Sequence, residues 1–458
     1  MQAMNMLIKG GTIVTSEKTF VSDILIENGI ISQIGESLTL PQNTRTIDAE
    51  GNYVFPGGID PHVHMALPTP AGPSADDFLT GSIAALYGGT TTLLDFVTPR
   101  KGQSLVEALD LRIQEAAKSL THYSFHVSPV EWRPTTEEEI TACFSKGITS
   151  FKVYMAYKRA VGLNDDDFYK VLQTVGRLGG MVTVHCELGD EIDVLRDQFV
   201  QEGKVSPEFH MKSRPPQLES EAVQRAIHLA EKAKCSLYIV HVSAKASLDN
   251  IRNARQQCNT VFAETCPHYL LLDDSKYFGS FQETVPYVIS PPLRKKEDNE
   301  ALWQAIAKGL VQTLGTDHCP FNLSQKSVGI NDFRRIPNGA GGVEHRLSLL
   351  YTYGVLTEKI SLKKLVDVFS TQPARLFGLF PAKGHIAVGA DADLVIWNPR
   401  SEQVITAANH HQHCDLEIYE GVSTKGHAEF VIVNGLVVLE NGKVKEDAGL
   451  GTFLQRGK

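Results

Sequence analysis

The sequence predicts an α/β protein: a (β/α)8 TIM-like barrel joined to a small β-sandwich domain that both ends of the chain build. Three observations predict this fold. Short apolar runs alternate with amphipathic stretches through the middle of the chain, glycine-punctuated β-rich runs occupy both ends, and potential metal ligands stand where several apolar runs stop. Alternating strands and helices form parallel sheets buried on both faces, and eight such units close into a barrel.

Both ends of the chain are predicted to form strands. Glycine and Asn-Gly pairs separate β-rich runs at 7–11, 12–14, 23–26 and 30–35, which is typical of hairpins. The same texture returns at 392–397 and 430–435. We therefore expect one discontinuous small domain, residues 1–54 and 376–458, with the barrel, residues 55–375, inserted between its two parts.

The middle of the chain is predicted to contain eight strand-then-helix units. The candidate strands are 53–59, 90–96, 123–127, 150–154, 181–185, 236–241, 260–265 and 311–316. The amphipathic stretches between them include 76–87, 104–119, 165–178, 219–233 and 244–257. In such a barrel the active site lies at the carboxyl ends of the strands, so side chains that close a strand are the candidates for chemistry.

Composition excludes several classes of function. The 458 residues are 42% hydrophobic and 21% charged, with a formal charge of -9 and a pI near 6.0. This balance argues against a nucleic-acid partner or an anionic membrane surface. No apolar run approaches the roughly 20 residues that span a bilayer, and the first residues lack the layout of a signal peptide. Seven scattered cysteines fit reduced thiols, so we expect a cytoplasmic protein.

Six potential metal ligands stand at the ends of candidate strands one, four, five, six and eight. They are His62, His64, Lys152, His185, His241 and Asp317. Taken singly, each has a structural alternative, such as a core histidine or an aspartate that caps the next helix. Scattered residues would not all fall at strand ends, however. Together they predict two divalent metals at the barrel mouth and hydrolysis by a metal-activated water.

Lys152 lies at the centre of an apolar run, Ser-Phe-Lys-Val-Tyr. Burying an ammonium is costly unless it is compensated, and burial lowers the pKa of a lysine. A neutral amine can capture carbon dioxide as a carbamate, whose two oxygens can bridge two metal ions. The alternative is a lysine that extends to solvent or pairs with a carboxylate; beside four histidines and Asp317 we favour the bridge.

Motifs along the whole chain carry a resemblance to a known family. They include Phe-Pro-Gly-Gly-Ile-Asp-Pro-His-Val-His (55–64), Phe-Lys-Val-Tyr-Met-Ala-Tyr-Lys (151–158), Val-His-Cys-Glu (184–187), Ser-Arg-Pro-Pro (213–216), Glu-Thr-Cys-Pro-His-Tyr-Leu (264–270), Val-Ile-Ser-Pro-Pro-Leu-Arg (288–294), Gly-Thr-Asp-His-Cys-Pro-Phe (315–321) and Ile-Pro-Asn-Gly (336–339). In their order and density the chain resembles the dihydropyrimidinase/hydantoinase family of cyclic amidohydrolases.

The resemblance implies a role for each candidate. His62, His64 and Asp317 would hold one metal and His185 and His241 the other, bridged by carboxylated Lys152 and a hydroxide; in the family the metal is usually zinc. Asp317 would accept the hydroxide's proton and deliver it to the leaving nitrogen. Tyr157 resembles the phenol that stabilises the oxyanion. Ser290 and Asn338 resemble positions whose backbone groups bind the substrate's imide edge.

The implied reaction is ring opening of a small cyclic diamide by the bridging hydroxide. A 5,6-dihydropyrimidine would give an N-carbamoyl-β-amino acid, as in pyrimidine catabolism, and a 5-substituted hydantoin an N-carbamoyl-α-amino acid. By resemblance, loops 65–72, 96–100 and 156–163 would surround the exocyclic substituent, and the apolar residues of the first favour apolar substituents. Relatives are commonly homotetramers, so the same assembly is expected here.

Three alternatives were weighed against this hypothesis. Dihydroorotase needs a cation for its substrate's carboxylate, commonly an arginine one residue past His-x-His, and that position is Met65 here. Allantoinase uses the same metal site and stays open. Collapsin response mediator scaffolds keep the fold but have lost metal ligands, whereas all six are present in this chain. The histidines of His410-His411-Gln412-His413 lie far past the barrel and are interpreted as structural.

Overall fold

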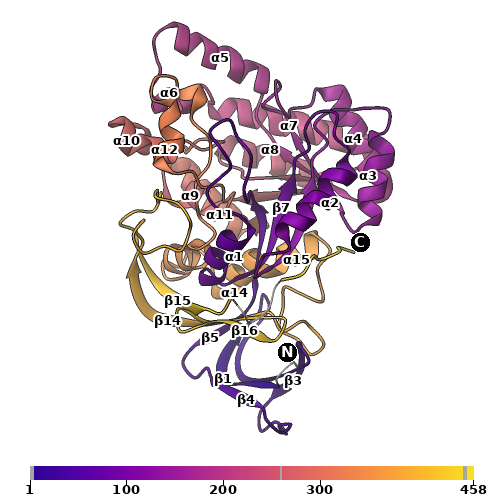
Figure 1. Ribbon diagram of the computed structural model, residues 1–458, viewed down its shortest axis with the longest axis vertical. Helices are drawn as coiled ribbons and strands as arrows, with labels where there is room; N and C mark the ends of the chain where they lie inside the picture. The colour runs from indigo at the N-terminus through magenta and orange to yellow at the C-terminus, as the bar shows by residue number, and fades with distance from the viewer. Residues whose placement is uncertain (1–4, 258–259, 447–450, 458) are drawn as a thin grey trace.

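The protein is described by a computed structural model that covers residues 5–257, 260–446 and 451–457. A barrel of eight parallel strands stands on a separate sheet of nine strands (Figure 1), and the predicted fold class is confirmed. The barrel strands lie in chain order: β6 (Gly58–Val63), β7 (Thr90–Val97), β8 (His122–Val127), β9 (Ser150–Tyr154), β10 (Met181–His185), β11 (Ser236–Ile239), β12 (Val261–Thr265) and β13 (Thr313–Leu314).

Helices surround the barrel and form its upper rim (Figure 1). Their bounds are α1 (Phe78–Tyr87), α2 (Leu105–Ala116), α3 (Thr136–Ser145), α4 (Asp165–Leu178), α5 (Gly189–Gln201), α6 (Pro207–Lys212), α7 (Pro216–Ala233), α8 (Lys245–Gln256), α9 (Pro267–Leu271), α10 (Phe281–Thr284), α11 (Lys296–Ala307), α12 (Leu323–Lys326), α13 (Arg346–Leu350), α14 (Leu362–Val366) and α15 (Gln372–Leu376). Within the described part of the chain, no helix is both long and apolar enough to cross a membrane.

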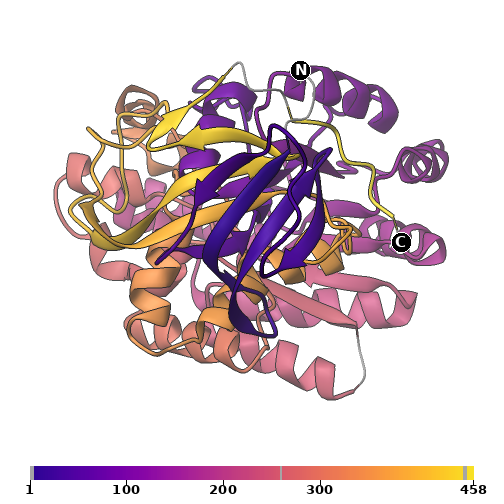
Figure 2. The same ribbon diagram turned by 90° about the horizontal axis from the view of Figure 1, so that it is seen from below.

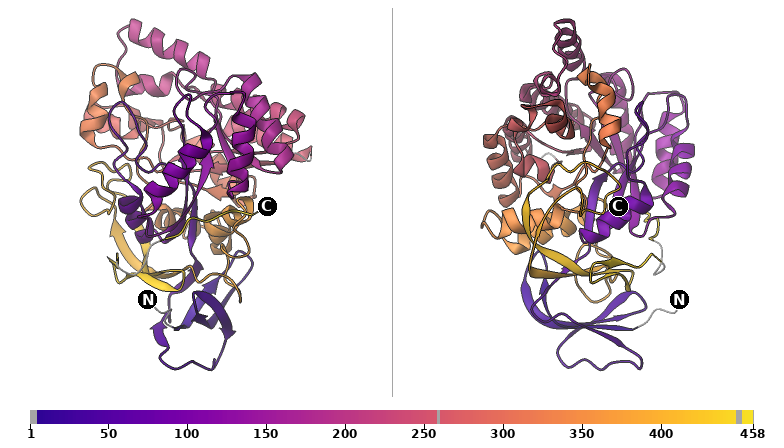
Figure 3. Two further views of the ribbon diagram at one scale, coloured as in Figure 1. Left: turned by 45° about the vertical axis from the view of Figure 1, so that its right-hand side comes forward. Right: turned by 60° about the vertical axis from the view of Figure 1, so that its left-hand side comes forward.

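The nine-stranded sheet, called the small sheet below after the small domain that the sequence predicts, is assembled from both ends of the chain. Its strands are β1 (Met6–Val14), β2 (Thr19–Glu27), β3 (Ile30–Gly35), β4 (Arg45–Asp48), β5 (Tyr53–Pro56), β14 (Leu394–Val404), β15 (Ser423–Val433), β16 (Leu436–Glu440) and β17 (Lys443–Val444). Antiparallel pairing of β5 with β14 joins the two ends (Figure 2). The sheet curves (Figure 3) around its own apolar core, to which Ile8, Ile24 and Ile396 belong.

The run 53–59, predicted as one strand, is divided between the two sheets. Its first part is β5 of the small sheet, and the first barrel strand, β6, begins only at Gly58. A Cβ atom on Gly57 would lie 2.2 Å from the Thr91 hydroxyl, and one on Gly58 would lie 2.2 Å from the Phe369 ring. The chain therefore crosses between the sheets where there is no room for a side chain, and the single-strand prediction was wrong at this point.

The barrel wall is thinly paired between β8 and β9, which pair only at Val127 and Phe151. The tail after the small sheet fills this seam. The Tyr123 amide donates to the Thr452 carbonyl (3.1 Å), and the Leu454 amide donates to the Tyr123 carbonyl (2.8 Å). Arg456 is buried and donates to the Ser150 hydroxyl at 2.7 Å. A segment from the end of the described chain thus completes the wall of the barrel.

Candidate active site

A cavity of about 690 Å³ opens at the carboxyl ends of the barrel strands. Its position follows from the fold, because parallel strands of a closed barrel all end at the same rim. The nine side chains predicted for the site all line this one cavity: His62, His64, Lys152, Tyr157, His185, His241, Ser290, Asp317 and Asn338. The structure therefore brings together residues that lie as far apart in sequence as His62 and Asn338.

The potential ligand atoms lie in two close groups. Asp317 Oδ1 lies 3.1 Å from Nε2 of both His62 and His64. His185 Nδ1 lies 2.9 Å from His241 Nε2. One ligand atom each from His62, His241 and Asp317 fits within 4.8 Å, so the two groups adjoin.

Hydrogen bonds to carboxylates determine which ring nitrogens face the neighbouring ligand atoms. His62 Nδ1 lies 2.6 Å from the Glu264 carboxylate, which accepts only, so Nδ1 carries a hydrogen and Nε2 faces the Asp317 carboxylate at 3.1 Å. In the same way Glu187, 2.7 Å from His185 Nε2, leaves the His185 Nδ1 lone pair facing His241. Either a proton or a metal ion lies between His62 Nε2 and Asp317, and the donor set fits a divalent metal.

Lys152 is buried in β9 with 1% of its surface exposed. Its Nζ lies 4.9 Å from the Phe96 ring centroid and 5.0 Å from that of Tyr154. It makes no hydrogen bond or ion pair with any residue that the structure describes. Burial lowers the pKa of this amine to about 8, so a neutral, nucleophilic form is accessible near neutral pH.

Three of the site residues have left-handed backbone conformations. The φ angles are 38° at His241, 51° at Asp317 and 59° at Tyr157. A non-glycine residue in this region costs on the order of 1–3 kcal/mol, and such residues concentrate at functional sites. The backbone turns sharply where the barrel strands end, and this turn aims the three side chains into the cavity.

Residues 53–438 match the model of the Amidohydrolase family. The chain belongs to this family. It is 43% identical to the D-hydantoinase of Geobacillus stearothermophilus, covering 99% of this chain and 97% of that protein. It is 39% identical to the dihydropyrimidinase of Rattus norvegicus, covering 98% and 88%. The crystal structure of dihydropyrimidinase from Brevibacillus agri aligns with a TM-score of 0.97, 40% identity and 99% coverage of both chains.

Amidohydrolases typically hold a binuclear metal centre, and the histidine and aspartate groups of this chain are able to bind metal. Two carboxylates that the sequence analysis did not single out hold candidate ligands in place. Glu264 bonds to His62, and Glu187 bonds to His185. Two features of the sequence could have indicated these residues. Glu187 follows His185 by two residues, and Glu264 lies in β12, the seventh barrel strand, for which the sequence analysis named no candidate.

Arg214 and Glu187 form an ion pair in which each side chain is only 1% exposed. We expect Glu187→Gln to lower the free energy of unfolding by about 3–5 kcal/mol, because it leaves a buried guanidinium without a counter-charge. Urea denaturation measures this effect. The matched control is Glu208→Gln, which removes the more exposed pair with Lys212 and should cost less than about 1 kcal/mol. Equal effects of the two substitutions would contradict the expectation.

The remaining predicted residues lie around the mouth of the cavity. The Tyr157 ring lies 5.3 Å from the His185 ring, and the Arg214 guanidinium lies 5.3 Å from the Tyr157 ring. Asn338 Nδ2 donates to the Ser290 hydroxyl at 3.0 Å. Apolar lining comes from loop residues that include Leu67, Pro68, Val161 and Ile336. The cavity therefore has a polar, ligand-rich floor and a largely apolar wall.

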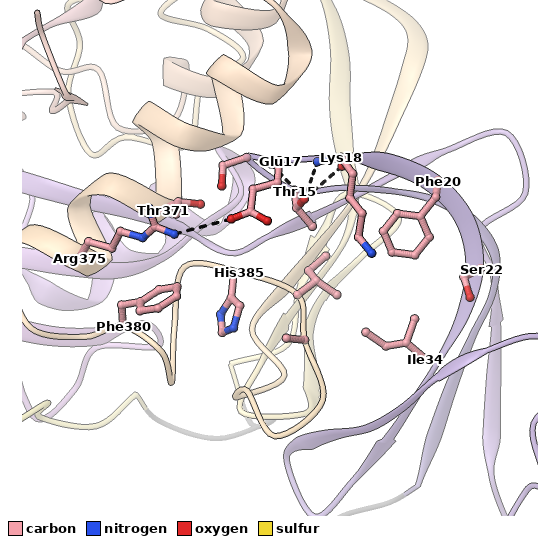
Figure 4. Close-up of a pocket in the computed structure, with 13 residues that line it drawn as sticks. Thr15, Glu17, Lys18, Phe20, Ser22, Ile34, Thr371, Arg375, Phe380 and His385 are labelled. Atoms are coloured by element: carbon pink, nitrogen blue, oxygen red, sulfur yellow. Dashed lines mark hydrogen bonds and ion pairs between the residues drawn. The ribbon is translucent and has the colours of Figure 1, made fainter. Parts of the chain in front are cut away.

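A second cavity, of about 480 Å³, lies between the small sheet and α15 (Figure 4). Its lining includes one carboxylate, Glu17, which lies 4.0 Å from the Arg375 guanidinium. Phe20, Ile34 and Phe380 contribute apolar surface. Among the described residues that line this cavity, the one carboxylate thus pairs with a cation and has no further potential metal ligand beside it. The cavity therefore lacks the set of metal ligands found at the barrel mouth.

Proposed function

We propose that this amidohydrolase opens the rings of cyclic diamides, 5,6-dihydropyrimidines and 5-substituted hydantoins, to N-carbamoyl amino acids. One observation carries the proposal: six potential ligands, among them an unpaired buried lysine, gather on the floor of a cavity with an apolar wall. The potential metal ligands on the floor of the cavity suit hydrolysis of an amide, and the apolar wall suits an apolar ring substituent.

We propose two divalent metals, zinc in the first instance, as the cofactors. His62, His64 and Asp317 would hold one, His185 and His241 the other, and the N6-carboxylated form of Lys152 would lie between them. The Lys152 amine forms this carbamate by adding to carbon dioxide and losing a proton, which converts an uncompensated amine into an anion. When bound, the two ions acidify a water molecule and polarise the scissile carbonyl.

The protein's own groups then move the protons and hold the ring. Asp317 accepts a proton from the attacking water and returns it to the ring nitrogen when the C–N bond breaks, which balances the hydrolysis. The Tyr157 hydroxyl donates to the oxygen that becomes negative. Groups at Ser290 and Asn338 bind the imide edge, which hydantoins and dihydropyrimidines share.

The wider expectations from the sequence are retained as proposals. We propose that residues 1–54 with 376–458 and residues 55–375 are the two domains. We further propose a cytoplasmic homotetramer that acts in pyrimidine catabolism. Size-exclusion chromatography with light scattering measures the assembly directly, and a monomer or dimer would contradict the tetramer.

Replacing Tyr157 by phenylalanine tests the role of its hydroxyl. We expect kcat to fall about 10²–10³-fold with a smaller change in KM, because the phenol donates mainly to charge that develops during the reaction. Steady-state rates of hydantoin ring opening measure the effect. Tyr154→Phe is the control, since Tyr154 lines the same cavity but is given no catalytic role. Similar losses in both variants would contradict the assignment.

The substrate class is tested with purified, zinc-supplemented enzyme and four rings: dihydrouracil, phenylhydantoin, allantoin and dihydroorotate. Loss of ring absorbance or appearance of the carbamoyl product reports turnover. We expect turnover of dihydrouracil or phenylhydantoin, with allantoin and dihydroorotate inert. Turnover of allantoin alone would overturn the substrate assignment in favour of allantoinase while leaving the proposed site chemistry intact.

A further inference from the structure

A second cluster of metal-ligand side chains lies outside the cavity, where the irregular segment between β14 and β15 runs beside the barrel (Figure 1). His345 stands directly before α13, and His410 and Glu417 belong to this segment, residues 405–421. In the described part of the chain, two groups of three histidine or acidic side chains place one ligand atom each within 4.8 Å. One belongs to the active-site cavity, and this cluster is the other.

The donor atoms of the cluster have the spacing of a tetrahedral site. Glu417 Oε2 lies 3.0 Å from His345 Nε2 and 3.0 Å from His410 Nδ1. Gln412 Nε2, whose place the amide oxygen would take after a half-turn of the side chain, lies 3.3 Å from His345 Nε2, 3.1 Å from His410 Nδ1 and 3.2 Å from Glu417 Oε2. Ligands about 2.0 Å from a zinc ion at the corners of a tetrahedron lie about 3.3 Å apart.

The orientation of His410 requires a positive charge inside the cluster. Its Nε2 lies 2.8 Å from the Cys414 carbonyl oxygen, which accepts only, so Nε2 carries the hydrogen. His410 Nδ1 therefore faces the Glu417 carboxylate, with either a lone pair or a second hydrogen between them. The same arrangement occurs between His62 and Asp317 in the active-site cavity. A metal ion or a proton between the two atoms supplies the positive charge at each place.

Gln412 supplies a second, independent indication of a ligand. It is 6% exposed and points its amide into the cluster, yet its Oε1 has no hydrogen-bond partner among the described residues. A half-turn of the amide brings Oε1 to the position that faces His345, His410 and Glu417. A cation there would bind this oxygen, which otherwise stays buried without a hydrogen-bond partner among the described residues.

The cluster is also held in place and accessible from outside. The Tyr419 amide donates to Glu417 Oε1 at 2.8 Å, which leaves Oε2 for the cluster, and the Cys414 carbonyl fixes the His410 ring. Such supporting bonds are typical of metal sites. A cavity of about 270 Å³ is lined by His345 together with Glu344 and His411, and so reaches one member of the cluster.

We propose that His345, His410 and Glu417, with the Gln412 carbonyl, bind a structural zinc ion that is separate from the catalytic centre. The ion would tie the segment 405–421 to the start of α13. This assignment replaces the interpretation of His410 as purely structural. The competing occupant is a proton bound to His410 or His345, which makes that ring an imidazolium. If a proton fills the cluster, replacing Glu417 would leave the zinc content of the protein unchanged.

Zinc content distinguishes the two occupants. Wild-type protein, Glu417→Gln and His411→Asn are purified with zinc, dialysed and analysed by inductively coupled plasma mass spectrometry. His411 is the control because its ring bonds to Glu344 and stacks on Tyr87, outside the cluster. We expect Glu417→Gln to hold one zinc per chain fewer than wild type, and His411→Asn to match wild type. Equal zinc in wild type and Glu417→Gln would overturn the proposal.

A measurement on the wild type keeps the proposal testable even if Glu417→Gln fails to fold. Crystals of the zinc-loaded protein are measured at energies on both sides of the zinc absorption edge. We expect an anomalous peak between His345, His410 and Glu417. A well-ordered cluster without such a peak would overturn the proposal. Neither experiment depends on whether the barrel cavity holds metal or which substrate it takes.

Discussion

Lys152→Met is expected to lower kcat/KM for ring opening by on the order of 10³-fold or more and to reduce the metal content of the barrel site. Methionine keeps the length and apolar character of the side chain but cannot form a carbamate. Metal ions contribute several kcal/mol to the stabilisation of such transition states, so losing their bridge should remove most of the rate. The stability of the metal-free protein should not fall, because the substitution removes a buried amine that makes no hydrogen bond or ion pair among the described residues.

Lys326 provides the matched control for this substitution. Like Lys152 it is 1% exposed, and burial lowers its pKa to about 7. Its amine instead donates to the Val288 and Pro337 carbonyls, at 2.9 Å and 3.3 Å. Lys326→Met should therefore lower the free energy of unfolding while the metal content of the barrel site stays unchanged. Full metal content and full activity in Lys152→Met would contradict the bridging role.

Asp317→Asn is expected to reduce kcat about 10²–10⁴-fold, with a smaller change in KM. The amide keeps an oxygen that can contact a metal, but it cannot carry the proton from the attacking water to the leaving nitrogen. Steady-state kinetics on dihydrouracil and phenylhydantoin measure the effect, together with metal analysis of the same sample. The expectation fails if kcat is retained while metal is bound.

A carboxylate at the rim of the same cavity serves as the control for Asp317. Asp332 pairs with Arg334, which lines the cavity, but it makes no contact with the proposed ligands. Asp332→Asn should change kcat less than about threefold, because exposed and half-exposed ion pairs contribute little. A loss as large as that of Asp317→Asn would show that any nearby negative charge matters, rather than the proton transfer assigned to Asp317.

The candidate residues could be found from the sequence because any residue that closes a barrel strand lies at the same rim of the barrel. His62, Lys152 and His185 each lie within or at the end of an apolar run, and the ends of parallel strands meet at one rim. Strand β9 and strand β10 have the bounds that the sequence predicted. The position of each side chain in its own strand was therefore enough to predict that these residues line one cavity.

The supporting contacts could not be found in this way, because they join residues that have no sequence relation. Glu264 reaches His62 across 202 positions, and Arg214 reaches Glu187 from the turn between α6 and α7. The division of 53–59 depends on the Thr91 and Phe369 side chains that crowd the two glycines. Likewise, a histidine-rich run gives no sign that His345 and Glu417 lie beside it.

The seam between β8 and β9 sets the order in which the barrel is completed during synthesis. Ser150 is translated 306 residues before Arg456, whose side chain it meets. At about 5–20 residues per second the two strands wait roughly 15–60 s for the segment that covers them. During that time their backbone groups face the cell unpaired, as on any open sheet edge, and can join another chain. A nascent copy released before the tail is made would therefore be an aggregation hazard, even though every proposed catalytic residue is already present.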